Sequence, residues 1–195
     1  MSADRPARVL VVCTGNICRS PAGERLLRAH LAPDGGIEVT SAGTHAMVGS
    51  PVADPMAALL VGDGVDVTGF SARQLTAPMV KDADLVITMT RAHRSAVART
   101  HPAAVRRTFT LRELARYITE AAAHDDADTT LRGRRGLDRV ETLVPLVAAR
   151  RGRTRVEADQ DEVVDPYGGD HALYDRSYAQ LRPAVLTVVG ALTGP

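Results

Sequence analysis

The sequence predicts an α/β fold, namely a single three-layer domain in which a four-stranded parallel sheet carries helices on both faces. Two short apolar segments, residues 9–12 and 84–89, show no alternation of polar and apolar residues, which is typical of strands buried on both faces. Helical patterns follow the strands along the chain, as in parallel sheets covered by helices. A chain of 195 residues is long enough for one domain with a sizeable core.

The composition is that of an ordinary globular chain. Hydrophobic residues make up 45% of the sequence but aromatic residues only 3%, so the core must consist mainly of valine, leucine and alanine. A formal net charge of +1 gives no reason to expect nucleic acid or a membrane surface as the partner. Residues 1–8 lack the apolar core of a signal peptide, and two cysteines in one loop are no disulfide framework, so a cytoplasmic protein is expected.

The first predicted strand, residues 9–12, leads through a short loop to Pro21, which suits the first turn of a helix over residues 21–31. Backbone N–H groups of such a loop converge on one point, where the positive end of the helix dipole also favours an anion. Cys13 stands at the mouth of this anion site, and the same field stabilises its nucleophilic thiolate. The guanidinium of Arg19 can return to the loop centre and match two phosphoryl oxygens at once.

Further strands and helices alternate along the rest of the chain. Glycine and proline residues separate the apolar segments, as expected for loops between regular elements. The predicted strands cover residues 37–40, 84–89 and 105–111, and the predicted helices cover residues 54–61, 91–100, 112–123, 137–149 and 170–192. Pro183 interrupts the last helix, which predicts a kink or a division into two helices.

The segment of residues 124–160 is rich in arginine and encloses the helical pattern of residues 137–149. A segment of this kind is commonly a solvated helix with mobile flanks. The alternative is a basic rim that recruits an acidic or phosphorylated partner. The sequence leaves both interpretations open.

Asp165 and Pro166 form a second candidate part of a catalytic site. Proline restricts the preceding residue to extended conformations, so a stiff backbone aims the Asp165 carboxylate. Hydrolysis of a phosphate monoester through a cysteine needs a thiolate, a cradle for three phosphoryl oxygens, and an acid for the leaving oxygen. Cys13, the loop with Arg19, and Asp165 would supply these three parts.

The strongest motif resembles the signature of the low-molecular-weight protein tyrosine phosphatases; it reads Cys13-Thr14-Gly15-Asn16-Ile17-Cys18-Arg19-Ser20-Pro21. Three further stretches are similar to family sequences: Ser41-Ala42-Gly43-Thr44, Ala72-Arg73-Gln74-Leu75 and Asp165-Pro166. The resemblance implies a flavodoxin-like fold, with residues 1–195 as a single phosphatase domain. Compared with the family, residues 124–160 look like a basic insertion.

The same resemblance implies a cysteine-dependent phosphatase that hydrolyses phosphotyrosine in proteins through a cysteinyl-phosphate intermediate. Cys13 is then the nucleophile, Arg19 neutralises the equatorial oxygens, and Asp165 first donates and later accepts a proton. The expected phosphate-binding residues are Thr14, Gly15, Asn16, Ile17, Cys18 and Arg19. This chemistry needs no cofactor and no metal ion, so neither is expected.

Three residues are expected to support the loop. Asn16 can hold an unusual backbone conformation through side-chain hydrogen bonds and tolerates a positive φ. Ser20 can donate its hydroxyl to the Cys13 sulfur, and the resemblance implies that Ser41 supports the loop through Asn16. Cys18 has two open interpretations: a small buried hydrophobic residue, or a thiol that traps oxidised Cys13 as a disulfide.

Three departures from the family pattern concern the substrate slot and the support of the loop. An aromatic residue commonly forms one wall of the slot in bacterial relatives, whereas this chain offers Met47 or His45 there, or lacks the wall. Tyr167 is well placed to stack on a phenyl ring. Phe70 stands where many relatives have a histidine that supports the loop. The insertion at residues 124–160 could cap the pocket.

Two other functions stay open at this point. A phosphomonoesterase acting on a nucleotide or sugar phosphate would fit a missing wall aromatic. An arsenate reductase uses a similar loop but normally relays a disulfide through further cysteines, and this chain has only Cys13 and Cys18. Ile17 favours phosphotyrosine, because relatives that act on phosphoarginine tend to have threonine there. The expected partner is a phosphorylated protein or a small phosphate ester, with no nucleic acid or membrane, and the oligomeric state is not predicted.

Overall fold

The computed structural model describes residues 5–31, 36–123, 130–153 and 156–194 of the chain. At its centre is a sheet of four parallel strands in the order β2-β1-β3-β4. The strands are β1 (Ala7–Cys13), β2 (Ile37–Gly43), β3 (Leu85–Thr88) and β4 (Thr108–Thr110). Val11 of β1 lies opposite Ser41 of β2 and Ile87 of β3. The predicted four-stranded parallel sheet is therefore confirmed.

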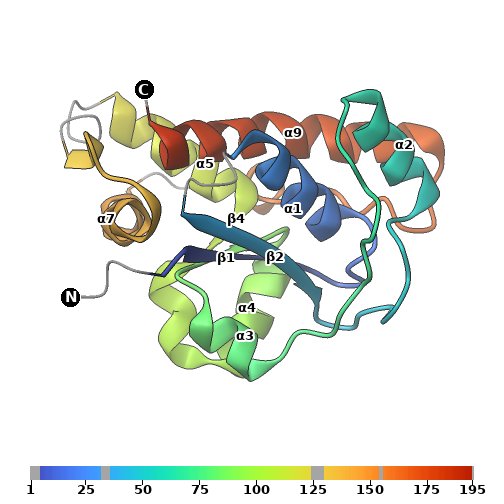
Figure 1. The fold of residues 1–195 in the computed structure, drawn as a ribbon, viewed down its shortest axis with the longest axis horizontal. Coiled ribbons are helices and arrows are strands. Elements are labelled where there is room, and N and C mark those ends of the chain that lie inside the picture. The colour runs from blue at the N-terminus through green and yellow to red at the C-terminus, as the bar shows by residue number, and fades with distance from the viewer. Residues whose placement is uncertain (1–4, 32–35, 124–129, 154–155, 195) are drawn as a thin grey trace.

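Helices cover both faces of this sheet (Figure 1). One face carries α1 (Arg19–His30), α5 (Leu111–Ala122) and α9 (His171–Thr193), with α2 (Asp54–Gly62) packed against α1 and α9. The other face carries α3 (Ala77–Asp82), α4 (Arg91–Thr100) and the 3-10 helix η1 (Pro102–Arg107). The predicted three-layer arrangement is confirmed.

The central strand β1 is apolar on both of its faces. Val9 and Val11 belong to the larger core cluster, which lies beneath α1 and α9. Leu10 and Val12 point the other way and belong to a second cluster with Val97 of α4. Because both faces are buried, the strand shows no alternation of polar and apolar residues in the sequence.

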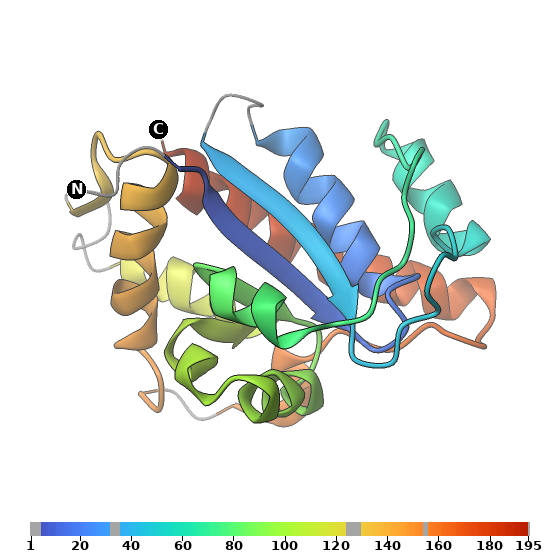
Figure 2. The same cartoon turned by 60° about the horizontal axis from the view of Figure 1, so that its bottom comes forward.

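Helix α7 (Gly136–Ala148) corrects two expectations for the arginine-rich segment. Leu137, Val140, Leu143 and Val147 are buried in the larger core cluster, so the expectation of a solvated helix is wrong. Figures 1 and 2 place α7 at the ends of the strands where β1 begins. Since Cys13 lies at the opposite end of β1, α7 does not cap the loop that follows Cys13. The expected mobile flanks fall partly on residues 124–129 and 154–155, which lie outside the described residues.

Two arginines of this segment are internal supports, so the expectation of a basic rim is wrong for them. Arg139 is 5% exposed and donates from Nε to the Ala191 carbonyl at 2.6 Å. The guanidinium of Arg151 lies 4.2 Å from the centre of the Phe109 ring, and it donates to the Val105 carbonyl at 2.9 Å. Both side chains bind carbonyl groups of the fold and are thus not presented to a partner.

The length of β4 and the continuity of α9 also differ from the predictions. Strand β4 is shorter than predicted, because η1 takes up residues 102–107 and the Thr108 hydroxyl donates to the Ala104 carbonyl at 2.7 Å. Helix α9 continues through Pro183, so the two-helix alternative is wrong. Its packing against α1 and α5 offsets the hydrogen bond that proline cannot make. Within the described residues, no helix is long and apolar enough to cross a membrane.

Candidate active site

The loop between β1 and α1 places Cys13 at the carboxyl end of the sheet. Cys13 is 2% exposed, and its Sγ lies 2.9 Å from Ser20 Oγ. Helix α1 starts at Arg19, and no side chain of the described residues caps its N-terminus. The uncapped N–H groups and the helix dipole therefore favour an anion beside Cys13.

Asn16 holds the loop in its unusual shape. Its φ is +54°, the single positive value among the non-glycine residues that the structure describes. Its Nδ2 donates to Ser20 Oγ at 2.9 Å and to Ser41 Oγ at 2.8 Å, and its Oδ1 accepts from the backbone N–H of Arg73 at 2.8 Å. Because Ser20 Oγ accepts from Asn16, its own proton is available to the Cys13 sulfur, where it stabilises a thiolate.

Glu24 is a buried acid behind the loop that the sequence analysis missed. It is 2% exposed on α1, and its Oε2 accepts the Ser41 hydroxyl proton at 2.6 Å. Arg28 Nη1 lies 3.3 Å from the same carboxylate, and Arg73 Nη2 lies 3.9 Å from it. Since Ser41 donates to Glu24, its oxygen is oriented to accept from Asn16. The sequence offered one signal for this residue, because Glu24 is an acidic residue among the positions that the predicted helix buries.

Arg19 joins the loop to the segment that carries Asp165. Arg19 is 3% exposed; its Nη1 donates to the Val163 carbonyl at 3.2 Å and its Nη2 to Asp165 Oδ2 at 2.5 Å. The Nε–H group is buried and has no acceptor among the described residues. A guanidinium with a donor to spare beside an uncapped helix N-terminus suits a phosphoryl group.

The Asp165 side chain is half-exposed and pairs with Arg19. Its Oδ1 accepts the N–H of Tyr167 at 3.2 Å. The preceding residue, Val164, donates its N–H to Gln180 Oε1 at 2.9 Å and accepts the Ser177 hydroxyl at 2.9 Å. Two side chains of α9 therefore fix the backbone from which the Asp165 carboxylate extends.

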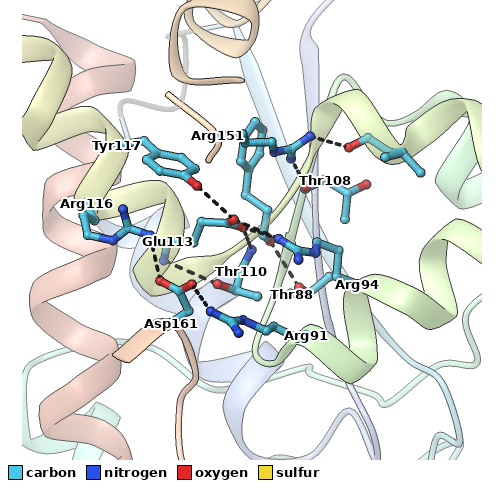
Figure 3. Close-up of polar contacts among 12 residues, drawn as sticks. Thr88, Arg91, Arg94, Thr108, Thr110, Glu113, Arg116, Tyr117, Arg151 and Asp161 are labelled. Carbon is cyan, nitrogen blue, oxygen red and sulfur yellow. Dashed lines mark hydrogen bonds and ion pairs between the residues drawn. The ribbon is translucent and has the colours of Figure 1, made fainter. Parts of the chain in front are cut away.

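An arginine network anchors the residues before Asp165 (Figure 3). Asp161, at the end of α8 (Ala158–Asp161), is 3% exposed and accepts from Arg91 Nη2 at 2.8 Å and Arg116 Nη2 at 3.0 Å. Arg91 belongs to α4 and Arg116 to α5, so one carboxylate ties α8 to two helices. The sequence analysis missed Asp161, and no local signal marks it, because its partners lie 70 and 45 residues away.

A single pocket of about 300 Å³ brings the predicted catalytic residues together. Its lining consists of Cys13, Thr14, Gly15, Ile17, Cys18, Arg19, His45, Met47, Asp165 and Tyr167. Met47 and Tyr167 are 44% and 63% exposed, so they form apolar walls that remain accessible to a ligand. The Met47 N–H donates to the Gly15 carbonyl at 2.9 Å, which ties this wall to the loop. Asn16, Ser20 and Ser41 lie behind the pocket as supports, not in its lining.

The comparison with protein families agrees with this geometry. The family described as "Low molecular weight phosphotyrosine protein phosphatase" matches residues 8–145 of the chain. The chain belongs to this family. The match ends before Asp165, so the place of Asp165 in the site comes from the structure.

Named members of the family are similar over different parts of the chain. The probable low molecular weight protein-tyrosine-phosphatase EpsP of Ralstonia solanacearum is 37% identical over 148 residues, which cover 72% of this chain and 96% of EpsP. The low molecular weight protein-tyrosine-phosphatase Etp of Escherichia coli strain K12 is 47% identical over 85 residues, which cover 44% of this chain. The match with Etp spans only 55% of that protein, about half of its length.

Solved structures of the family share the fold. The tyrosine phosphatase AmsI of Erwinia amylovora superposes with a TM-score of 0.68 at 27% identity, over 100% of this chain and 98% of AmsI. The arginine phosphatase YwlE of Geobacillus stearothermophilus gives a TM-score of 0.65 at 26% identity, over 94% and 91% of the two chains. The low-molecular-weight phosphatase fold predicted from the motif is confirmed.

Phe70 stands where the sequence analysis expects many relatives to have a supporting histidine. It is 9% exposed, and Arg25 lies over its ring with Cζ 5.5 Å from the ring centre. The loop keeps a support from the same stretch of chain, because Asn16 accepts the backbone N–H of Arg73. A backbone donor of this kind does not depend on the side chain at position 70.

Cys18, the last residue of the loop before α1, is buried against α9. It is 4% exposed, and its Sγ lies 3.7 Å from the hydroxyl of Tyr174. Burial raises the pKa of the Cys18 thiol to about 11, so the thiol is protonated near neutral pH. A protonated thiol attacks an oxidised sulfur slowly. Both interpretations of Cys18, a small core residue or a trap for oxidised Cys13, stay predictions.

Proposed function

We propose that the protein is a cysteine-dependent phosphatase that hydrolyses phosphotyrosine in proteins. The observation that carries this proposal is the convergence of Cys13, Arg19 and Asp165 on one pocket with apolar walls. Family membership supports it, because the relative Etp is named a low molecular weight protein-tyrosine-phosphatase and EpsP a probable one. The substrate is then a phosphorylated protein whose tyrosine side chain enters the pocket.

In the first step, the Cys13 thiolate attacks phosphorus in line with the leaving oxygen. A sulfur–phosphorus bond forms, the phosphorus–oxygen bond to the tyrosine breaks, and Asp165 donates its proton to the departing phenolate oxygen. Backbone N–H groups of residues 14–19 and the Arg19 guanidinium neutralise the charge on the three equatorial oxygens. Ser20 stabilises the thiolate before the attack, through the contact of 2.9 Å to Sγ.

In the second step, the Asp165 carboxylate accepts a proton from water. The water oxygen attacks phosphorus, the sulfur–phosphorus bond breaks, and inorganic phosphate and the Cys13 thiolate are released. Asp165 is protonated again and ready for the next substrate. Every step uses side chains of this chain and needs no cofactor or metal ion.

Arg19 and Asp165 form an ion pair at the pocket. A phosphoryl group carries more negative charge than a carboxylate and offers the guanidinium two oxygens at once. Substrate binding therefore draws Arg19 Nη2 towards the phosphoryl oxygens and releases Asp165 towards the leaving oxygen. The Nε–H of Arg19, which has no acceptor among the described residues, adds a further donor.

The walls of the pocket support an aromatic substrate over a small polar one. Ile17, Met47 and Tyr167 present apolar surface to whatever is attached to the phosphate. A phenol ring stacks favourably against such walls, whereas a sugar phosphate would leave its hydroxyl groups without partners there. Arsenate reduction is less supported, because both cysteines lie within the loop. We place the protein in the cytoplasm, without a nucleic-acid or membrane partner, on the grounds of its composition.

Steady-state rates on two panels of substrates test this proposal. One panel holds phosphotyrosine peptides, and the other holds nucleotides, sugar phosphates and a phosphoarginine peptide. We expect kcat/KM to be highest for phosphotyrosine and to vanish in Cys13→Ser. Faster turnover of one small phosphate or of phosphoarginine would keep the chemistry and reject the substrate. Turnover that survives Cys13→Ser would reject the mechanism.

A further inference from the structure

His93 is a buried histidine with a hydroxyl group at each ring nitrogen. It lies in the first turn of α4 and is 6% exposed. Its Nδ1 lies 2.9 Å from Thr90 Oγ1, and its Nε2 lies 2.9 Å from Thr14 Oγ1. Thr14 is the residue that follows Cys13, so the imidazole ring bridges the start of α4 and the catalytic loop. The catalytic steps above give none of these three side chains a role.

The tautomer of the ring sets the direction of these hydrogen bonds. Thr90 Oγ1 accepts the backbone N–H of His93 at 3.2 Å, as the cap of α4. The hydroxyl of Thr90 therefore has one proton left to donate, and Nδ1 is the acceptor in reach. With Nδ1 as an acceptor, a neutral imidazole carries its proton on Nε2 and donates it to Thr14 Oγ1. Thr14 then keeps its own hydroxyl proton for another acceptor.

The environment of His93 keeps the ring in this neutral state. Burial and the positive charge of Arg19 lower the pKa of His93 to about 4, against a smaller opposing effect of Asp165. Arg19 and Asp165 are the charged groups that act on the ring. An imidazolium would have protons on both nitrogens and could not accept from Thr90. Near neutral pH the directions derived above are therefore maintained.

The position of Thr14 determines where its spare proton can go. Thr14 lines the catalytic pocket, and it also lines a neighbouring cavity that contains His93. Its oxygen accepts from His93 on the side of α4, so its own O–H bond points away from the ring, where the catalytic pocket offers it room. The acceptors that enter that pocket during the proposed reaction are the oxygens of a phosphate group.

We propose that His93 is a positioning residue that fixes the Thr14 hydroxyl as a hydrogen-bond donor to a phosphate oxygen in the catalytic pocket. The inference rests on the proposed function only for the chemical class of the ligand. It adds a side-chain donor to the backbone N–H groups of the loop. It also assigns His93 an effect on the ligand that passes through Thr14 alone.

Calorimetric binding of inorganic phosphate tests the inference without any need for turnover. Thr14→Val keeps the shape of the side chain but removes the hydroxyl, and we expect roughly tenfold weaker binding, as for the loss of one hydrogen bond to a charged group. His93→Leu should weaken binding by a similar factor. The double variant should bind no more weakly than Thr14→Val, because His93 acts through Thr14. Thr14→Ser restores a hydroxyl and should recover most of the loss.

His101→Leu is the matched control, since it removes an imidazole at the other end of α4. Should His93→Leu fail to fold, Thr90→Val removes the proton donor at Nδ1 instead. This change should weaken phosphate binding in the wild-type background but not in the Thr14→Val background. Phosphate binding within twofold of the wild type in Thr14→Val would overturn the inference. The inference would also be overturned if the double variant lost phosphate affinity by the product of the two single fold-losses. Phosphate binding as expected, in a protein that does not hydrolyse phosphotyrosine, would reject the proposed function and keep this inference.

Discussion

The catalytic loop and the segment that carries Asp165 are held in place by different kinds of interaction. Around the loop, the neutral side chains of Asn16, Ser20 and Ser41 form short hydrogen bonds and are fully buried. The segment before Asp165 depends on Asp161, whose carboxylate binds two partly exposed arginines (Figure 3). The loop is held directly by neutral side chains, with the Glu24 carboxylate one hydrogen bond behind them, whereas the segment before Asp165 is tied down by ion pairs with Asp161.

This difference separates two requirements of the proposed reaction. The nucleophile and the phosphate oxygens need fixed donors, and buried neutral hydrogen bonds supply them without being screened by salt. The acid has to move from Arg19 to the leaving oxygen and later to water. A half-exposed carboxylate can make that movement by turning its side chain, while the backbone stays fixed at Val164 and Asp161. Variants in the two regions should therefore fail in different ways.

Among the variants other than Cys13→Ser, Asp165→Asn should lower activity the most relative to the wild type. Losing a general acid should lower kcat/KM, which reports the first step, on a phosphotyrosine peptide by roughly 10²–10⁴. The loss should be smaller for p-nitrophenyl phosphate, because its leaving group needs little protonation. Calorimetry should find phosphate binding no weaker than in the wild type, since Arg19 no longer pairs with a carboxylate. Equal losses on both substrates would contradict the acid role.

Asn16→Ala tests the neutral framework of the loop. Three hydrogen bonds are lost, and alanine is strained at a φ of +54°, so the free energy of unfolding should fall by about 3–4 kcal/mol. Asn16→Gly loses the same hydrogen bonds without the backbone strain and should be about 1 kcal/mol more stable than Asn16→Ala. Urea unfolding measures both. Equal stability of the two variants would mean that the positive φ carries no strain.

The pH dependence of stability tests the neutral state of His93 beside the loop. The unfolded chain binds a proton on this histidine below about pH 6.5, whereas the folded protein binds it only below the lowered pKa of about 4. The free energy of unfolding therefore falls as the pH drops between these values. As the pH drops from about 6.5 to about 4, the free energy of unfolding should fall by roughly 3 kcal/mol less in His93→Leu than in the wild type. Parallel pH profiles would mean that His93 titrates normally.

Asp161→Asn tests the charged anchor and should have the smallest effect. Its two arginines can turn to solvent, so we expect a loss of stability of about 1–2 kcal/mol and a fall in kcat of about tenfold. Added salt should reduce the difference from the wild type, because salt screens partly exposed ion pairs. Asp138→Asn is the matched control, since Asp138 pairs with Arg134 on the surface. An equal effect of the control would show that the anchor is not specific.

What the sequence could predict follows the same division. The loop lies within nine consecutive residues, so its nucleophile, its arginine and its supporting Asn16 and Ser20 were all named from the sequence. Asp165 was named because a proline follows it. The walls Met47 and Tyr167 were expected from their positions relative to these motifs, and the structure brings them into the same pocket.

The residues that the sequence analysis missed act across the fold. Glu24, His93 and Asp161 are polar residues whose partners become neighbours only when the sheet and helices pack together. The packing of α7 was also missed, although Leu137, Val140 and Val147 repeat at helical spacing. Its many arginines suggested exposure, but long side chains can cover apolar surface and bind carbonyls instead.

The most direct measurement is to trap the intermediate on Asp165→Asn during turnover of p-nitrophenyl phosphate. This substrate needs little help from an acid in the first step, whereas the second step still needs Asp165 to activate water. Rapid quenching and mass spectrometry should therefore find phosphate bound to Cys13, at a higher level than in the wild type. Turnover with phosphate on another residue, or with no phosphorylated protein in either form, would contradict the account.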